Sequence, residues 1–165
     1  MAGVKKLEYS IEISPDITVK IGDKKNAIKM IKGNKEQKRI FHDNIIFELD
    51  NNKLKVSIKG AKKDQRRIFG SVKSHIRNML EGLGKDFEYE LEVCNAHFPI
   101  NVSFDKTKSE FMIKNFLGEK FPRILKTKGA IEVEVKMPVI KIRAHDIELA
   151  GQVAADLEKV TKIRN

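Results

Sequence analysis

A shift of 84 residues brings the chain into register with itself, and this internal repeat is what most limits how it can fold. Arg39 then falls on Arg123 and Ile40 on Ile124. The same shift aligns Pro15 with Pro99, Phe47 with Ile131, Leu49 with Val133, Val56 with Ile140, Ile58 with Ile142 and Lys59 with Arg143. The repeat predicts two tandem copies of one small domain, residues 1–84 and residues 85–165.

The length of 165 residues suits two such copies, each just large enough for a core of its own. No apolar run approaches the ~20 residues that span a membrane. The opening MAGVKKLEYS lacks the apolar stretch of a secretory signal. The single Cys94 cannot form an internal disulfide. We therefore expect a cytoplasmic protein with no membrane partner, in which Cys94 packs in the interior.

Positive charge is concentrated in the first copy. The net charge is +10; residues 1–85 hold 20 Lys and Arg against 10 Asp and Glu, and residues 86–165 hold 13 of each kind. A sustained positive field attracts polyanions, and nucleic acid is the commonest polyanion inside cells. Composition therefore favours a nucleic-acid partner over a protein that is basic for solubility alone.

Alternation of apolar and polar residues predicts six short strands in the first copy, at 9–13, 17–21, 27–31, 38–41, 45–49 and 53–59. Asp50, Asn51 and Asn52 predict a tight hairpin turn between the last two. The second copy repeats the pattern at 87–93, 100–104, 110–115, 123–125, 131–136 and 139–143. These runs predict an antiparallel sheet in each copy.

After each set of strands the apolar period changes to three and four residues, which predicts a helix. The first helix runs from about residue 62 to 83, with Gly82 and Gly84 expected to end it in a left-handed conformation. Asp146 is expected to cap the second helix, whose apolar stripe extends to Val160. The fold class is therefore α+β: two copies of an antiparallel sheet with a helix packed on one face.

No constellation of residues indicates catalysis or a cofactor. The four histidines lie far apart without metal-binding spacing, and the glycines beside Lys85 and Lys120 lack the phosphate-loop pattern. Glu132 and Glu134 alternate along a strand, as on a solvated sheet face. Converging carboxylates of a metal-dependent nuclease are the alternative there. We expect no enzyme, no metal and no cofactor.

Cations gather where a helix starts and on one loop. Lys62, Lys63, Arg66 and Arg67 stand at the start of the first helix, where outward backbone N–H groups favour a phosphate. In the second copy the segment 115–123 is a basic loop containing Phe116 and Phe121, which either stack on bases or anchor the loop to the core.

Four segments, in order, carry a resemblance to a known family. They are RIFGSVKSHIRNM from Arg67 to Met79, AHFP from residue 96, NFLGEK from Asn115 to Lys120, and residues 146–155. The chain resembles universal family six of the large ribosomal subunit proteins, of the archaeal and eukaryotic type, from about Ile11 to Thr161.

The resemblance implies two tandem α/β domains that bind large-subunit ribosomal RNA near the sarcin–ricin loop and the stalk base. Neighbouring ribosomal proteins and translational GTPases would lie close by, and the role would be architectural. It implies RNA contacts at Gly118, Lys120 and Arg123, joined by Lys162 and Arg164 near the short C-terminal tail.

The complete set of expected RNA-binding residues combines both lines of reasoning. It comprises Lys62, Lys63, Arg66, Arg67, Lys73, Arg77, Gly118, Lys120, Arg123, Lys126, Lys128, Lys162 and Arg164. A nucleic-acid-binding module outside the ribosome is the alternative function.

Overall fold

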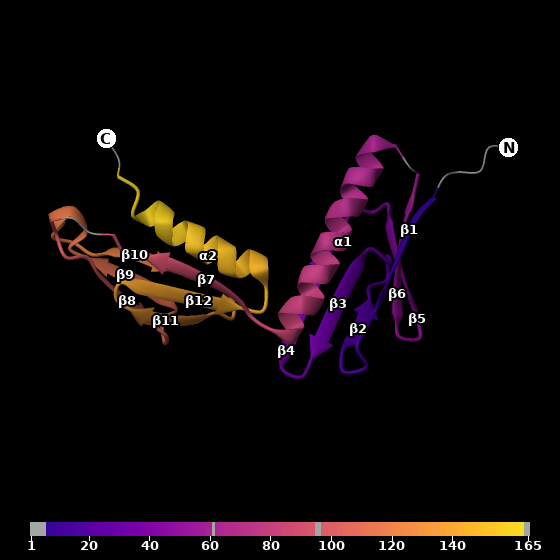
Figure 1. Ribbon diagram of the computed structural model, residues 1–165, viewed down its shortest axis with the longest axis horizontal. Helices are drawn as coiled ribbons and strands as arrows, with labels where there is room; N and C mark the ends of the chain where they lie inside the picture. Colours follow the sequence, from indigo (N-terminus) through magenta and orange to yellow (C-terminus); the bar gives the residue numbers. More distant parts are fainter. Residues whose placement is uncertain (1–5, 61, 95–96, 164–165) are drawn as a thin grey trace. The chain divides into compact units, whose positions relative to one another are not determined.

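The computed structural model describes residues 6–60, 62–94 and 97–163. The chain separates into two compact units, Met1–Lys85 (unit 1) and Asp86–Asn165 (unit 2) (Figure 1). No helix among the described residues is long and apolar enough to cross a membrane.

Unit 1 consists of two small antiparallel sheets and a long helix. Its elements are β1 (Lys6–Glu12), β2 (Thr18–Ile21), β3 (Ala27–Lys32), β4 (Lys35–Ile40), β5 (Ile45–Asp50), β6 (Lys53–Lys59) and α1 (Lys63–Gly84). The strand orders are β1-β6-β5 and β2-β3-β4. Helix α1 contacts strands of both sheets, so it holds the two together.

Unit 2 has the same strand orders, β7-β12-β11 and β8-β9-β10. Its elements are β7 (Phe87–Glu92), β8 (Asn101–Asp105), β9 (Glu110–Lys114), η1 (Phe116–Gly118), β10 (Arg123–Lys126), β11 (Glu132–Lys136), β12 (Val139–Ala144) and α2 (Ile147–Val160). In both units the first, sixth and fifth strands form one sheet, and the second, third and fourth form the other. The predicted α+β fold class, two tandem sheet-plus-helix copies, is confirmed.

Each unit has its own hydrophobic core, because alternate strand residues and one helix stripe face inward. In unit 1, Phe47 on β5 and Ile76 on α1 are buried in one cluster. In unit 2, Phe111 on β9 and Leu157 on α2 are buried in another. The assignment of separate roles to residues 1–84 and 85–165 stays a prediction.

The β5–β6 turn has the conformation that was predicted, whereas the end of α1 does not. Asn51 has the positive φ of 52° that the β5–β6 hairpin was expected to use. Helix α1, however, runs through Gly82 and Gly84 and ends when Lys85 turns extended, with φ −144°. Gly82 is buried within the helix, so it serves packing rather than termination.

Candidate nucleic-acid interface

The start of α1 presents exposed cations. Lys62 is the N-cap, and its backbone N–H donates to Oε1 of Gln65 at 2.8 Å. A lysine side chain has no acceptor to offer the first-turn N–H groups, which remain available to an anion. Lys62, Lys63 and Arg66 are exposed and form no ion pair within the described residues. Arg67 differs, since its Nη2 lies 3.5 Å from the Asp64 carboxylate.

The basic surface continues along the helix, because Arg66, Lys73 and Arg77 are spaced by seven and four residues and so lie on one side of it. Lys73 is half-buried, with Nζ 4.8 Å from the ring centroids of both Tyr9 and Phe69. Arg77 is exposed. Lys73 therefore covers part of the unit 1 core, while Arg66 and Arg77 face solvent.

In unit 2 the expected RNA-binding loop is built on left-handed backbone. Asn115, Leu117 and Gly118 have φ values of 58°, 51° and 78°. A Cβ on Gly118 would approach the Phe98 ring to 3.4 Å. Nδ2 of Asn115 donates to the Pro99 carbonyl at 3.1 Å, which ties the loop to the segment before β8. The loop is thus fixed in shape by its own contacts.

Arg123 fastens this loop to the end of α2. Its Nε donates to Glu119 Oε2 at 2.8 Å, Nη2 pairs with the same carboxylate, and Nη1 donates to the Val160 carbonyl at 2.5 Å. The guanidinium carbon lies 4.2 Å from the centre of the buried Phe116 ring. Hydrogen bonding to Arg123 holds the pKa of Glu119 below its usual range, and Glu119 raises the pKa of Arg123. The guanidinium donors of Arg123 are therefore occupied by contacts within unit 2. RNA contact through Arg123 stays a prediction.

The other predicted cations of unit 2 fall into two places. Lys120 is exposed on the loop. Lys162 is also exposed, and it lies near the loop, since its carbonyl oxygen is 3.5 Å from Nη1 of Arg123. Lys126 and Lys128 are exposed at the other end of β10. Arg164 lies outside the described residues. The structure therefore brings Lys120, Arg123 and Lys162 to one end of unit 2.

The two aromatic residues of the loop have different surroundings. Phe116 is 7% exposed and belongs to the core, as the anchoring interpretation required, whereas Phe121 is 83% exposed. Phe98, which belongs to the AHFP segment named above for the family resemblance, is 50% exposed. No sequence periodicity marked Phe98, because it precedes a strand rather than lying in one.

Several carboxylates of the β7-β12-β11 sheet, Glu88, Glu90 and Glu134 among them, are paired with cations. Glu88 pairs with Arg143 and with Lys141, whose Nζ lies 3.3 Å from Oε1. Glu134 Oε2 lies 3.8 Å from Nη1 of Arg143. The hydrogen bond from Arg143 lowers the pKa of Glu88. Within residues 6–60, 62–94 and 97–163, no group of three or more His, Cys, Asp or Glu is arranged to hold a metal.

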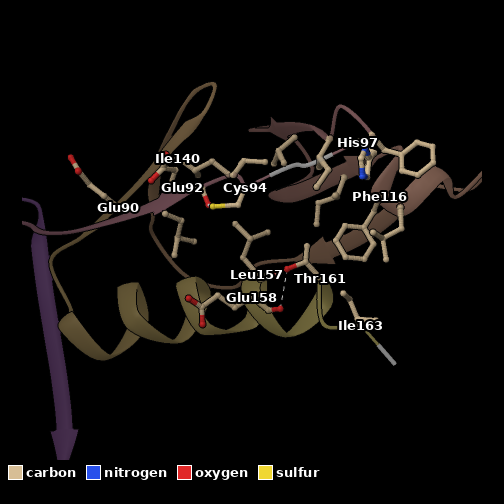
Figure 2. Close-up of a pocket in the computed structure, with 17 residues that line it drawn as sticks. Glu90, Glu92, Cys94, His97, Phe116, Ile140, Leu157, Glu158, Thr161 and Ile163 are labelled. Atoms are coloured by element: carbon tan, nitrogen blue, oxygen red, sulfur yellow. Dashed lines mark hydrogen bonds between the residues drawn. The ribbon is translucent and has the colours of Figure 1, made fainter. Parts of the chain in front are cut away.

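A feature that sequence reasoning missed is an open hollow of about 670 Å³ in unit 2, lined mostly by apolar side chains and also by Glu90, Glu92 and Glu158. Figure 2 shows Phe116 and His97 on one side of it, and on the other Leu157 of α2 and Thr161, the residue directly after α2. Cys94 lies at this hollow and is exposed, so the expectation of an interior cysteine is wrong. The reason is that β7 ends at Glu92, before Cys94 is reached.

The structure is thus that of a basic tandem-repeat α+β protein, in which one fold occurs twice. No family model matches the chain. Curated relatives do, each carrying the name Large ribosomal subunit protein uL6. The relative from Staphylothermus marinus is 37% identical over 166 residues, which cover all of this chain and 90% of the relative.

Two further archaeal relatives agree. That of Aeropyrum pernix is 34% identical over 155 residues, or 94% of this chain and 84% of the relative. That of Methanococcus vannielii is 34% identical over 159 residues, or 96% of this chain and 85% of the relative. The chain therefore belongs to the uL6 family of large ribosomal subunit proteins, and the resemblance noted in its motifs is confirmed.

Proposed function

We propose that the protein is a structural component of the large ribosomal subunit in the cytoplasm. It binds large-subunit ribosomal RNA near the sarcin–ricin loop and the stalk base, beside neighbouring ribosomal proteins, and supports the region that translational GTPases approach. Its role is architectural and needs no cofactor. The observation that carries this proposal is the set of exposed cations without ion pairs at the start of α1, Lys62, Lys63 and Arg66, in a member of this family.

Binding follows from charge and from the fixed shape of each unit. The cations of α1 and the first-turn N–H groups meet phosphates of one RNA element, and Lys120 with Lys162 meet phosphates of another. Phosphate contacts fix position and orientation without reading bases. Folded RNA is recognised mostly through such contacts and through shape. Residues 1–84 supply the strongly basic domain, and residues 85–165 supply the loop.

The test is filter binding of purified protein to large-subunit ribosomal RNA over a series of salt concentrations. The logarithm of the affinity should fall with log salt by roughly 0.7 to 0.9 per phosphate contact. The triple variant Lys62→Ala, Lys63→Ala, Arg66→Ala should reduce that slope by about two to three, since each phosphate contact contributes about one.

The matched control removes the same charge elsewhere in unit 1, through Lys20→Ala, Lys24→Ala and Lys38→Ala, all exposed in wild type. It should leave most of the slope in place. A flat salt response of the wild type, or equal losses from the two triple variants, would contradict the proposed interface. Arg123→Ala is unsuitable as a probe, because it also releases Glu119 and the end of α2.

Location is tested in two steps. In a sucrose gradient of lysate the protein should sediment with large subunits; recovery only in slower fractions would favour a nucleic-acid module outside the ribosome. Chemical footprinting of subunits with and without the protein should then show protection at the sarcin–ricin loop and stalk base. Protection confined to other RNA segments would overturn the proposed location.

A further inference from the structure

Strand β7 lies at the edge of its sheet, since β12 is its only partner strand within the described residues. Directly after β7, the N–H of Val93 donates to the Pro138 carbonyl at 2.8 Å, so the backbone of Val93 faces the β12 side. In an antiparallel pair, residues bonded in this way alternate with residues whose N–H and C=O point away from the partner strand. The N–H and C=O groups of Glu90 and Glu92 therefore point to the unpaired side of β7.

The hollow of about 670 Å³ adjoins this unpaired side of β7, because Glu90 and Glu92 line it across from α2 (Figure 2). The Cys94 thiol lies 3.9 Å from the Glu92 carbonyl oxygen, and sulfur makes only a weak contact of this kind. An occupant of the hollow can therefore reach backbone donors and acceptors as well as apolar side chains.

Unit 1 fills the equivalent place with its own helix, since α1 has 22 residues and α2 has 14. Met79 on α1 is 5% exposed, whereas Ile163, 84 positions later and beyond α2, is 62% exposed. Leu117, which lines the hollow together with Ile163, is 52% exposed. Exposed apolar side chains gathered around one hollow are typical of an interaction surface.

The charged residues that line the hollow, Glu90, Glu92 and Glu158, are all acidic. Lys141 pairs with Glu90, whereas Glu92 and Glu158 are exposed and form no ion pair within the part of the chain that the structure describes. These carboxylates would repel the phosphates of RNA. A second copy of β7 would set glutamate against glutamate across the new strand pair, which is also unfavourable. The occupant that fits is therefore apolar and basic.

We propose that β7 and the hollow bind an extended segment of a neighbouring protein of the large subunit, in which apolar residues alternate with Lys or Arg. The segment pairs with the backbone of Glu90 and Glu92 as an added strand. Because successive side chains of a strand point to opposite faces, its apolar residues enter the hollow beside Leu91, and its cations lie on the face of the Glu92 carboxylate. Backbone hydrogen bonds supply affinity in this mode of recognition, and alternate side chains supply specificity. The inference rests on the proposed place in the large subunit and adds the chemistry of one protein partner.

The first experiment measures the binding of synthetic heptapeptides to the full chain by fluorescence anisotropy. The probe alternates four lysines with three apolar residues. Two further peptides carry N-methyl groups on one or the other set of alternate backbone amides, which removes those donors. One of the two should bind at least about fivefold more weakly than the probe, because only one set of amides faces β7. A peptide with glutamate in place of lysine should also bind more weakly, although the net charge of +10 favours it.

Glu92→Pro tests the edge of β7 itself. The N–H of Glu92 points away from β12, so proline spares the β7–β12 ladder but cannot donate to an added strand. The variant should lose the difference between the probe and the N-methylated peptides and keep its affinity for ribosomal RNA. An unchanged difference would contradict the added strand.

The matched control is Glu8→Pro, 84 residues earlier on β1. The Ile13 N–H donates to the Asn52 carbonyl at 2.8 Å, so by the same alternation the backbone of Glu8 points away from β6. This variant should bind all the peptides as the wild type does. Glu92→Lys is a second variant that keeps the backbone, should Glu92→Pro fail to fold; it should weaken binding of the lysine probe by at least about twofold.

Cys94 serves to identify the partner in the assembled subunit, because it is the only cysteine of the chain and is exposed at the hollow. A benzophenone group attached to Cys94 is irradiated after the protein has entered large subunits, and the crosslinked peptides are sequenced by mass spectrometry. The expected product is a protein segment in which Lys or Arg alternates with apolar residues. Crosslinks confined to ribosomal RNA, or to a segment without that pattern, would overturn the inference.

The outcomes separate the two proposals. Equal binding of the probe and both N-methylated peptides, no binding of the probe, or its displacement by ribosomal RNA would overturn the added strand and leave RNA binding in place. A protein that neither binds ribosomal RNA nor enters large subunits would overturn the proposed function instead.

Discussion

Arginine stands at the same place in both units, and in both it links the fourth strand to the helix. In unit 1, Nη2 of Arg39 lies 3.4 Å from Nε2 of His75 on α1. In unit 2, Arg123 donates to the Val160 carbonyl at the end of α2. The position that the repeat preserves is therefore structural. The charge that is preserved between the copies therefore serves contacts within each unit.

The N-cap residues of the two helices, unlike the conserved arginine, differ between the units. Lys62 and Asp146 are 84 residues apart and both are N-caps. Asp146 accepts from the Glu148 N–H at 2.9 Å, so α2 is capped by its own carboxylate. Lys62 offers α1 no such acceptor and adds positive charge. A side chain therefore caps the first-turn N–H groups in α2, whereas in α1 these groups stay available to an anion.

The largest expected effect tests whether the units are independent. Phe47→Ala and Phe111→Ala each remove a side chain that is 0–1% exposed, at a cost of about 3–5 kcal/mol of unfolding free energy. Hydrogen exchange followed by mass spectrometry should locate the loss of protection. Phe47→Ala should affect unit 1 alone and Phe111→Ala unit 2 alone, because the two cores share no residue. Equal loss in both units from either variant would show one cooperative structure instead.

Exchanging the two N-cap residues should stabilise unit 1 and destabilise unit 2. Asp146→Lys should lower the free energy of unfolding by about 1 kcal/mol, the usual worth of an N-cap. Lys62→Asp should stabilise unit 1 by about 0.5–1 kcal/mol and weaken RNA binding, since it fills the anion site. Urea titration measures the first effect and filter binding the second. Lys62→Ala separates loss of charge from gain of a cap; RNA affinity unchanged in Lys62→Asp would show that α1 does not meet RNA there.

The positions of the strands and helices could be predicted from the sequence. The twelve strands and two α-helices of the described residues lie where period-two and period-3.6 patterns predicted them, because burial of one face imposes those periods. The pairing into two sheets in each unit was not predicted, since local pattern does not specify which strands become neighbours. The position at which α1 ends agrees with the prediction, but the expected left-handed glycine was wrong, since Gly82 and Gly84 lie within the helix and Lys85 turns extended.

The candidate site was harder to predict than the fold. Exposure of Lys62 and Lys120 follows from their place at a helix start and in a loop. The hydrogen bond from Arg123 to the Val160 carbonyl spans 37 residues, and no local spacing in the sequence reveals it. The hollow near Phe98 likewise depends on where α2 stops relative to the sheet.

The smallest expected change in the free energy of unfolding comes from replacing one glycine in each helix by alanine. A Cβ on Gly70 of α1 would meet nothing within 4 Å, so Gly70→Ala should stabilise unit 1 by about 0.5–1 kcal/mol through helix propensity. On Gly151 of α2 a Cβ would lie 3.1 Å from the Tyr89 hydroxyl oxygen, so Gly151→Ala must displace that ring and should gain less. Urea titration of the two variants measures the difference. Equal gains would mean that Tyr89 moves at no cost, and a loss at Gly70 would mean that α1 is covered by something outside its own unit.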